Sequence, residues 1–312
     1  MSKKSLMVVE SNRVIEACYR LTLVEKQIIL YAIVKARDEQ KGLTTDDPVT
    51  IKALEFAAQF NTEVGSVYGQ LKEAMATLYR RDVWIHDTYP LTGEPRVTET
   101  RWISAASYID GDGVIQIIFA PKIIPYITRL DKEFTSYRLD KVGKLSSVHA
   151  VRIYELLVQY LSLGKREFEI AKLKWMLGLS ELEYTDMGNF KKRVLDVSIT
   201  QINEHTDITT SYTQRKTGRN VTHLLFAIAL KTDATAKKPK IDDAYLAKHA
   251  YPGESRETAR ARLKAKLNAK PVKSAAPAPT STPRPSTPEE RAARPQLVVD
   301  GKIVIQPEWA KK

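Results

Sequence analysis

The feature of this sequence that most constrains its fold is a succession of elements that occurs twice. Apolar residues recur at helical spacing three times in each half, and alternating runs that are typical of strands follow the third helix. The helical patterns cover 22–37, 51–60 and 66–80 in the first half, and 146–161, the later part of 167–179 and 189–203 in the second. Helix, helix, turn, helix and hairpin is the order of a winged helix, so the sequence predicts two of them.

The apolar positions of the two halves also match one another, which indicates an internal duplication. An offset of 119 residues aligns Leu54 with Leu173, Ala57 with Met176, Ala58 with Leu177, Leu71 with Phe190, Met75 with Val194, and Leu78 with Val197. We therefore expect an α+β fold of two tandem winged-helix domains related by duplication. The predicted boundaries are 1–120 for the N-terminal domain and 121–231 for the C-terminal domain.

Beyond these domains the composition changes, and residues 232–312 are expected to form a flexible basic tail. The stretch 271–290 is dense in Pro, Ser, Thr and Ala and cannot bury a core, so the tail should be largely disordered. A short helix is predicted near 254–269. The alternating residues of 296–309 predict a small hairpin with its turn at Asp300-Gly301.

The charge of the chain points to an acidic partner, and most of that charge lies in the tail. The 312 residues are 43% hydrophobic, and their formal net charge of +12 suggests nucleic acid or an anionic membrane surface. Residues 231–312 contribute +9 of this charge, which leaves only +3 for residues 1–230. A binding face on the folded part must therefore be a local patch.

Cysteine usage and hydropathy indicate a protein of the cytoplasm. Cys18 is the one cysteine, so no intrachain disulfide or cysteine metal cluster can form, as is usual in a reducing compartment. The first residues lack the apolar run of a signal peptide, and no stretch approaches the length of a membrane span.

The helix predicted over 189–203 has a cationic side that suits DNA. At about 100° per residue, its polar side chains gather in an arc of roughly 100°. These are Asn189, Lys192, Arg193, Asp196, Thr200 and Asn203, and Lys191 lies at the edge as a candidate phosphate contact. Arg and Lys can donate to guanine, Asn can bridge adenine and Asp can accept from cytosine. An amphipathic helix with a solvated basic face is the simpler alternative.

Neighbouring cations favour DNA binding over that alternative and make the C-terminal domain the main DNA reader. Arg215, Lys216 and Arg219 lie at the tip of the next hairpin, where a wing would contact phosphate or a minor groove. Lys172 and Lys174 lie on the preceding helix. Three elements would then present cations on one face.

The corresponding face of the first half is less basic. Its third helix is expected to point Ser66, Gly69, Gln70, Glu73 and Thr77 outward, with Tyr68 and Lys72 at the edge. Glu73 suits a polyanion poorly unless it reads cytosine. Arg80, Arg81, Arg96 and Arg101 are candidate phosphate contacts. A winged domain that binds protein is the alternative for this half.

Signatures of catalysis are missing from the sequence, and neither a metal nor a cofactor is expected. The five histidines form no His-x-His pair, which a metal-dependent strand-nicking site would need beside a nucleophilic tyrosine. Gly143-Lys144-Leu145 lacks the flanking residues of a phosphate-binding loop. Single histidines and Trp84, Trp102 and Trp175 are interpreted as structural residues.

Over residues 9–230 the sequence resembles the initiator Rep proteins of theta-replicating plasmids. The resemblance is carried by five colinear stretches: SNRVIEACYRLTLVEKQIILYAI, RWISAASYIDGDGVIQIIFAP, FTSYRLDKVGKLSSVHAVRIYELL, FKKRVLDVSITQINEHTDI and KTGRNVTHLLFAI. A later stretch, YPGESRETARARL, resembles a segment of some members. The rest of the tail departs from compact members of that family.

The resemblance implies a replication initiator with two tandem winged helices. Monomers would bind repeated origin sequences, called iterons, help to open A+T-rich DNA and recruit the host initiator and the replicative helicase. Dimers would repress the protein's own promoter or couple origins, and so contribute to plasmid copy control. The major-groove helix would be the Phe190–Val194 segment, with a counterpart around 66–72, and dimer contacts are expected near Arg101-Trp102.

Three other functions remain open at this point. A tandem winged-helix transcription regulator would occupy a single operator. A nicking replication enzyme would cleave origin DNA, and a membrane-surface or scaffold protein would depend on the basic tail.

Overall fold

The computed structural model of the chain describes residues 6–231, apart from 90–91, 110–111, 129–132 and 219, and also 257–258, 260, 296–299 and 302–305. Two compact units are present, one formed by 1–230 with 293–312 and the other by 231–292. The elements that matter for function lie in the first unit. Among the described residues, no helix is both long and apolar enough to cross a membrane.

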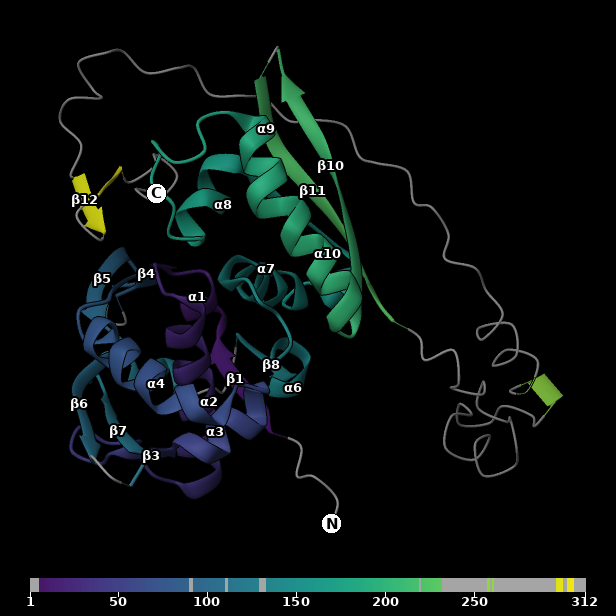
Figure 1. Cartoon of the computed structure of the whole chain (residues 1–312). Coiled ribbons are helices and arrows are strands. Elements are labelled where there is room, and N and C mark those ends of the chain that lie inside the picture. Colours follow the sequence, from purple (N-terminus) through teal and green to yellow (C-terminus); the bar gives the residue numbers. More distant parts are fainter. Residues whose placement is uncertain are drawn as a thin grey trace. The chain divides into compact units, whose positions relative to one another are not determined.

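The first half contains a winged helix in which three helices pack with a three-stranded sheet (Figure 1). Its elements are α2 (Leu23–Glu39), β3 (Val49–Lys52), α3 (Ala53–Phe60), α4 (Val64–Leu78), β6 (Ile103–Ile109) and β7 (Val114–Phe119). The strand order is β3-β7-β6, with antiparallel pairs throughout. The predicted capping box is present at the start of α2, where Thr22 accepts from the Glu25 amide and Glu25 accepts from the Thr22 amide.

The second half repeats this topology. Its elements are α7 (Val148–Val158), η1 (Leu161–Leu163), β9 (Lys165–Glu169), α8 (Ile170–Met176), α9 (Met187–Phe190), η2 (Lys191–Leu195), α10 (Asp196–His205), β10 (Ile208–Thr217) and β11 (Asn220–Leu230). The strand order β10-β11-β9 corresponds to β6-β7-β3 of the first half, strand for strand. This correspondence confirms the predicted fold class of two tandem winged helices.

The first half carries further elements around its winged helix. These are β1 (Met7–Ser11), α1 (Asn12–Ile15), β2 (Cys18–Tyr19), β4 (Asp82–Thr88), β5 (Pro95–Arg101), α5 (Ile124–Thr128), β8 (Phe134–Arg138) and α6 (Leu139–Val142). Strands β2, β4 and β5 form a second sheet, and β1 pairs with β8. The division of the domains at residue 120 stays a prediction, although β8 pairs with the N-terminal strand.

The alternating run before residue 110 is two strands in different sheets, because Trp102 turns inward between them. Trp102 is fully buried and its ring meets that of Tyr19 edge-on at 5.0 Å between centroids. The Trp102 side chain therefore belongs to the core, whereas the Arg101 side chain is 51% exposed, and dimer contacts in this region stay a prediction. Trp84 and Trp175 are buried, as predicted.

The aligned apolar positions agree with the structure less well than the order of elements does. Leu54 is 66% exposed and Val197 is 42% exposed, so neither belongs to the core. A single offset fails because three residues connect α3 to α4, whereas ten connect α8 to α9. Counted from the first residue of each helix, Phe190 corresponds to Val67 and not to Leu71.

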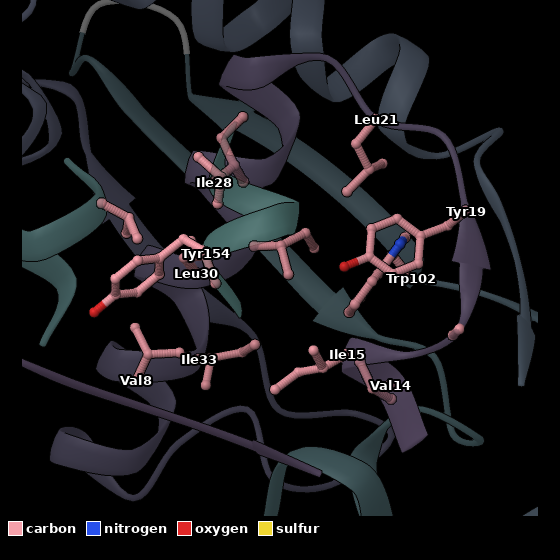
Figure 2. Close-up of a cluster of buried hydrophobic side chains, with 14 of the residues drawn as sticks. Val8, Val14, Ile15, Tyr19, Leu21, Ile28, Leu30, Ile33, Trp102 and Tyr154 are labelled. Atoms are coloured by element: carbon pink, nitrogen blue, oxygen red, sulfur yellow. The ribbon is translucent and has the colours of Figure 1, made fainter. Parts of the chain in front are cut away.

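One continuous cluster of buried side chains runs through both halves. Figure 2 shows its centre, where α2 contributes Ile28, Leu30 and Ile33, and Tyr154 enters from α7. Helix α2 is buried on nearly all sides, and even its residues Glu25, Lys26 and Gln27 are buried. A helix enclosed in this way is the centre of a large core and not a surface helix.

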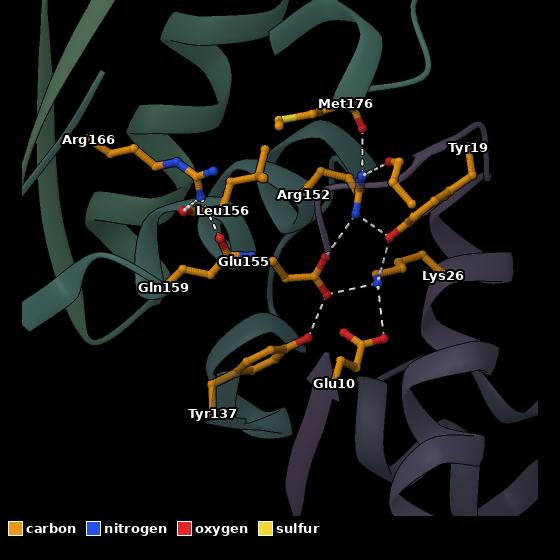
Figure 3. A network of polar contacts seen from close by, with 11 residues as sticks. Glu10, Tyr19, Lys26, Tyr137, Arg152, Glu155, Leu156, Gln159, Arg166 and Met176 are labelled. Atoms are coloured by element: carbon orange, nitrogen blue, oxygen red, sulfur yellow. Dashed lines mark hydrogen bonds and ion pairs between the residues drawn. The ribbon is translucent and has the colours of Figure 1, made fainter. Parts of the chain in front are cut away.

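Buried charges join the two halves within this core (Figure 3). The Lys26 Nζ lies 2.9 Å from Glu155 Oε1 and 3.8 Å from Glu10 Oε1, and all three side chains are fully buried. Burial raises the pKa of Glu10 to about 7, against the opposing effect of Lys26. Because an unpaired charge is costly in an apolar core, these groups hold β1, α2 and α7 together.

Arg152 extends the network from α7 to the first half. Its Nη2 donates to the Ala17 carbonyl at 2.8 Å and to the Met176 carbonyl at 2.6 Å, and its Nη1 donates to the Tyr19 hydroxyl. At Gly178, an added Cβ would lie 2.2 Å from the Tyr19 carbonyl oxygen, so the two backbones approach closely.

The predicted tail elements are described only in part. Residues 257–258 and 260 are helical, and the rest of the helix expected over 254–269 lies outside the described residues. Strands β12 (Gln296–Val299) and β13 (Lys302–Ile305) pair antiparallel, with Val299 opposite Lys302. The hairpin prediction is thus confirmed for its strands, and its turn residues are not described.

Replacing Arg152 by Leu should lower the free energy of unfolding by about 3–5 kcal/mol, because Glu155 and two carbonyls would lose their buried partner. Urea unfolding of the full-length protein measures the loss. Arg138→Leu is the control, since Arg138 forms an exposed ion pair with Asp140 and should leave stability nearly unchanged. Equal, small losses for both variants would contradict the role of Arg152.

Candidate nucleic-acid interface

The third helix of the second half is continuous from α9 through η2 to α10 (Figure 1). It begins at Met187 and is capped by the preceding Asp186, whose Oδ1 accepts the Asn189 amide at 2.8 Å. The preceding turn is held by Lys174, whose Nζ donates to the carbonyls of Glu183 and Tyr184 at 3.1 and 2.8 Å. Lys174 therefore supports the turn, in place of the phosphate-facing role suggested by the sequence.

A π-helical turn, η2, carries the three adjacent cations. Phe190, Val194, Ser198 and Ile202 are buried at intervals of four residues. In a regular α-helix this spacing would drift by about 40° per turn, and the wider π turn absorbs part of that drift. The sequence pattern groups Val197 with Phe190 and Val194, but Leu195 and Ser198 are fully buried and Val197 is left 42% exposed at the margin of the buried side.

The structure places most of the predicted reading residues on the outward side of this helix. Asn189, Lys192, Arg193, Asp196 and Thr200 are exposed, and Lys191 is half-buried. Asn189 and Arg193 also line one shallow pocket at the start of α9, together with Glu183, Tyr184, Thr185 and Asp186. The carboxylates of Glu183 and Asp186 line this pocket and disfavour a phosphate there.

Two polar residues of the predicted arc hold the helix against the sheet. Asn203 is half-buried, donates to the Thr210 carbonyl at 2.9 Å and accepts from the Thr210 amide at 2.7 Å. It is therefore a structural residue and not a reader of bases. Asp196 accepts from the Tyr212 hydroxyl at 2.7 Å, and burial together with this bond raises the pKa of Tyr212.

The hairpin of β10 and β11 forms the wing beside this helix (Figure 1). Its pairing shifts register between Arg215 and Lys216, and Gly218 adopts a positive φ of 63° at the turn. Lys216 is exposed, and Arg215 is exposed while its Nε lies 2.8 Å from Glu167 Oε1 on β9. Arg219 lies outside the described residues, so its predicted contact with DNA stays a prediction.

In the first half, the start of α4 lies against the wing strand β6. The Tyr68 hydroxyl donates to the Ile109 carbonyl at 3.3 Å, and the Lys72 Nζ lies 4.5 Å from the centre of the Tyr108 ring. Gln70 is exposed and donates to the half-buried Ser66 at 3.0 Å. The predicted residues of this half therefore gather on one face, although Tyr68 and Lys72 already have partners within the protein.

Two glycines on α4 have no packing reason to be glycine. Gly65 and Gly69 are exposed, and a Cβ added to either would meet no atom within 4 Å. Glycine inside a helix costs about 0.8–1.0 kcal/mol relative to alanine. A surface that approaches the helix backbone closely would offset this cost.

Two of the arginines proposed for phosphate are occupied elsewhere. Arg81 is 15% exposed and its Nε lies 3.0 Å from the buried Glu25. Arg96 donates two hydrogen bonds to the Asp87 carboxylate, at 2.8 and 2.6 Å. Burial by itself raises the pKa of this carboxyl, but the bonds to the carboxylate outweigh burial and the pKa is lowered. Arg80 and Arg101 are exposed, although the Arg101 Nε lies 3.5 Å from Asp82 Oδ1.

Two histidines, His86 and His149, have structural surroundings. The His86 ring packs against Trp175 at 4.7 Å between centroids, and burial lowers its pKa. Burial also lowers the pKa of His149 to about 4. Within the part of the chain that the structure describes, no group of three or more His, Cys, Asp or Glu side chains is arranged to hold a metal ion.

Known proteins match this chain in both halves. A family model described as Initiator Replication protein, WH1, matches residues 7–158, and one described as Initiator Rep protein, WH2, matches 169–228. An uncharacterized 27.6 kDa protein of Escherichia coli is 27% identical over 224 residues, which are 69% of this chain and 92% of that protein.

Two further proteins are similar to this chain over about three quarters of its length. The PI protein of Escherichia coli is 24% identical over 259 residues, which are 74% of this chain and 85% of that protein. The crystal structure of Pi initiator protein in complex with iteron DNA is similar with a TM-score of 0.62 at 22% identity, over 74% of this chain and 100% of that chain. Identity this low shows a common fold and nothing more.

We expect Gly69→Ala to stabilise the protein by up to about 1 kcal/mol and at the same time to weaken binding to duplex DNA. The added methyl group improves helix propensity but obstructs close approach to the helix backbone. Thermal unfolding and fluorescence anisotropy, with a duplex taken from the DNA that flanks the gene, measure the two effects. Unchanged DNA affinity in a stabilised variant would show that no partner needs this glycine.

Proposed function

The chain belongs to the initiator replication protein family, and on this basis we propose that it starts plasmid replication by binding iterons in double-stranded origin DNA. The observation that carries the proposal is the outward face of the α9–η2–α10 helix. Lys192 and Arg193 are exposed on it beside a wing that presents Lys216. The Pi initiator protein, which has the same fold, is known in complex with iteron DNA.

In the proposed complex, the α9–η2–α10 helix enters the major groove. Arg193 donates to guanine O6 and N7, and Asn189 bridges adenine from the neighbouring helical turn. Lys191, Lys192 and Lys216 contact phosphates or bases at the edge of this face, Thr200 lies further along it, and Asp196 keeps one oxygen for cytosine N4. Arg215 leaves its ion pair with Glu167 and contacts a phosphate instead. Arg219 is proposed as a further contact with phosphate or the minor groove.

The first half contributes a second and weaker contact. The face of Ser66, Tyr68, Gly69, Gln70 and Lys72 approaches the adjacent stretch of the same duplex. It presents few free cations, and Glu73 is exposed nearby. The C-terminal winged helix is therefore the main reader in this proposal, and the N-terminal one adds length to the recognised site.

Origin opening and recruitment of the host initiator and the replicative helicase follow from iteron binding by monomers. Dimers of the chain repress its own promoter. We assign no catalytic step and no cofactor to the chain, and we place its activity in the cytoplasm.

Footprinting on the parental replicon tests this function. Protection of several direct repeats at an origin is the expected result, and protection of one palindrome alone would favour a transcription regulator. Incubation of supercoiled origin DNA with divalent metal tests the nicking alternative, for which a nick or a covalent protein–DNA adduct would be decisive. Deletion of 232–312 should leave most specific affinity intact, whereas a scaffold that binds through its tail would lose it.

Arg193→Ala and Lys216→Ala should weaken binding in different ways. We expect Arg193→Ala to cost about 1–3 kcal/mol and to relax specificity at one base pair. Lys216→Ala should weaken binding to all sequences alike and reduce the salt dependence by about one released counterion. Competition titrations against single-base variants of the repeat, repeated at several salt concentrations, separate the two effects. Equal losses for Arg193→Ala on every variant would refute its role as a base reader.

A further inference from the structure

Val197 occupies an unusual place on the reading helix. Its side chain is 42% exposed, and it belongs neither to the buried core nor to the partly buried side chains packed against the core. Valine is a weaker helix former than alanine because its branched Cβ restricts the side chain. An exposed valine at the start of α10 therefore contributes little to the fold.

The position of Val197 aligns it with the residues that face DNA. It follows Arg193 by four residues and precedes Thr200 by three, and residues at these spacings are neighbours on a helix surface. Asn189, Arg193 and Thr200 are all exposed. Val197 is thus an apolar side chain within a row of hydrogen-bonding side chains.

The buried side of this helix leaves Val197 at its margin. The fully buried residues are Phe190, Val194, Leu195, Ser198 and Ile202. At about 100° per residue, Val197 lies roughly 90° or more from the centre of that buried side. Its side chain is therefore directed toward the edge of the outward face.

In the major groove, the one apolar group on the base edges is the C5 methyl group of thymine. We propose that Val197 recognises this methyl group at one thymine of the repeat, within the complex formed by the proposed function on which this inference rests. The contact specifies a T·A pair beside the base pair that Arg193 reads. It supplies discrimination that hydrogen bonds from Arg193 and Asn189 do not provide.

Uracil substitution tests the contact, because uracil differs from thymine only by the missing methyl group. The probes are duplexes that carry one repeat from the parental replicon, each with a single thymine replaced by uracil. Full-length protein should bind one of these duplexes about fourfold more weakly, as expected for the burial of one methyl group. The other substitutions should change the affinity less than twofold.

Combining Val197→Ala with the uracil substitution gives a double-mutant cycle between the protein side chain and the thymine methyl group. The variant should bind the thymine duplex about fourfold more weakly than the unaltered protein, and uracil at the sensitive position should cause no further loss. Leu163→Ala is the matched control, since Leu163 is an apolar side chain, 67% exposed, in η1 and outside the reading helix. It should retain the full sensitivity to uracil.

Two results would overturn the assignment of Val197. The unaltered protein could be insensitive to uracil at every position, or Val197→Ala could keep the same fourfold sensitivity. Either result, obtained with a protein that still prefers the repeat over a scrambled duplex, rejects the role of Val197 alone. Loss of that preference in the unaltered protein would reject both the proposed function and this inference.

Discussion

The buried ion pair between Lys26 and Glu155 is the contact on which the arrangement of both winged helices depends. Lys26 belongs to the central helix of the first half, and Glu155 to the first helix of the second half. Arg152, one turn from Glu155, adds bonds to the carbonyls of Ala17 and Met176. Charges buried in this way gain little net stability, but removing one partner is costly. They therefore permit one packing of the two halves and penalise others.

A fixed packing of the halves also matters for the DNA site that we propose. Each winged helix presents its third helix and its hairpin with the same topology, since β6-β7-β3 corresponds to β10-β11-β9. Within the second half, the bonds of Asn203 to Thr210 and of Tyr212 to Asp196 fix the α9–η2–α10 helix against the wing. Lys174 fixes the turn that precedes it. The exposed side chains of the helix thus project from a rigid support, which favours specificity over adaptability.

Much of the candidate site could be predicted from residue types alone. The outward positions of Lys192 and Arg193 follow from the apolar spacing on either side of them, because charged side chains are rarely buried unpaired. The roles of Lys174, Asn203, Arg81 and Arg96 could not be predicted, since each depends on which group the fold brings within hydrogen-bond distance: a turn for Lys174, a neighbouring strand for Asn203 and Arg96, and a helix 56 residues away for Arg81. Their charge or polarity is the same whether they bind phosphate, a carbonyl or a carboxylate. Which of these groups lies within hydrogen-bond distance in the folded chain decides which partner each side chain binds.

The sequence by itself determined the order of elements, the duplication, the capping box at Thr22 and the basic character of one helix. These features depend on local periodicity and local hydrogen bonding, which the chain specifies over a few residues. The tertiary structure alone decided that Trp102 divides two sheets, that Lys26 and Arg152 are buried, and that Val197 faces outward. The last of these depends on how the helix is rotated against the core, where Val194, Leu195 and Ser198 are fully buried, and the apolar character of Val197 alone does not determine that rotation.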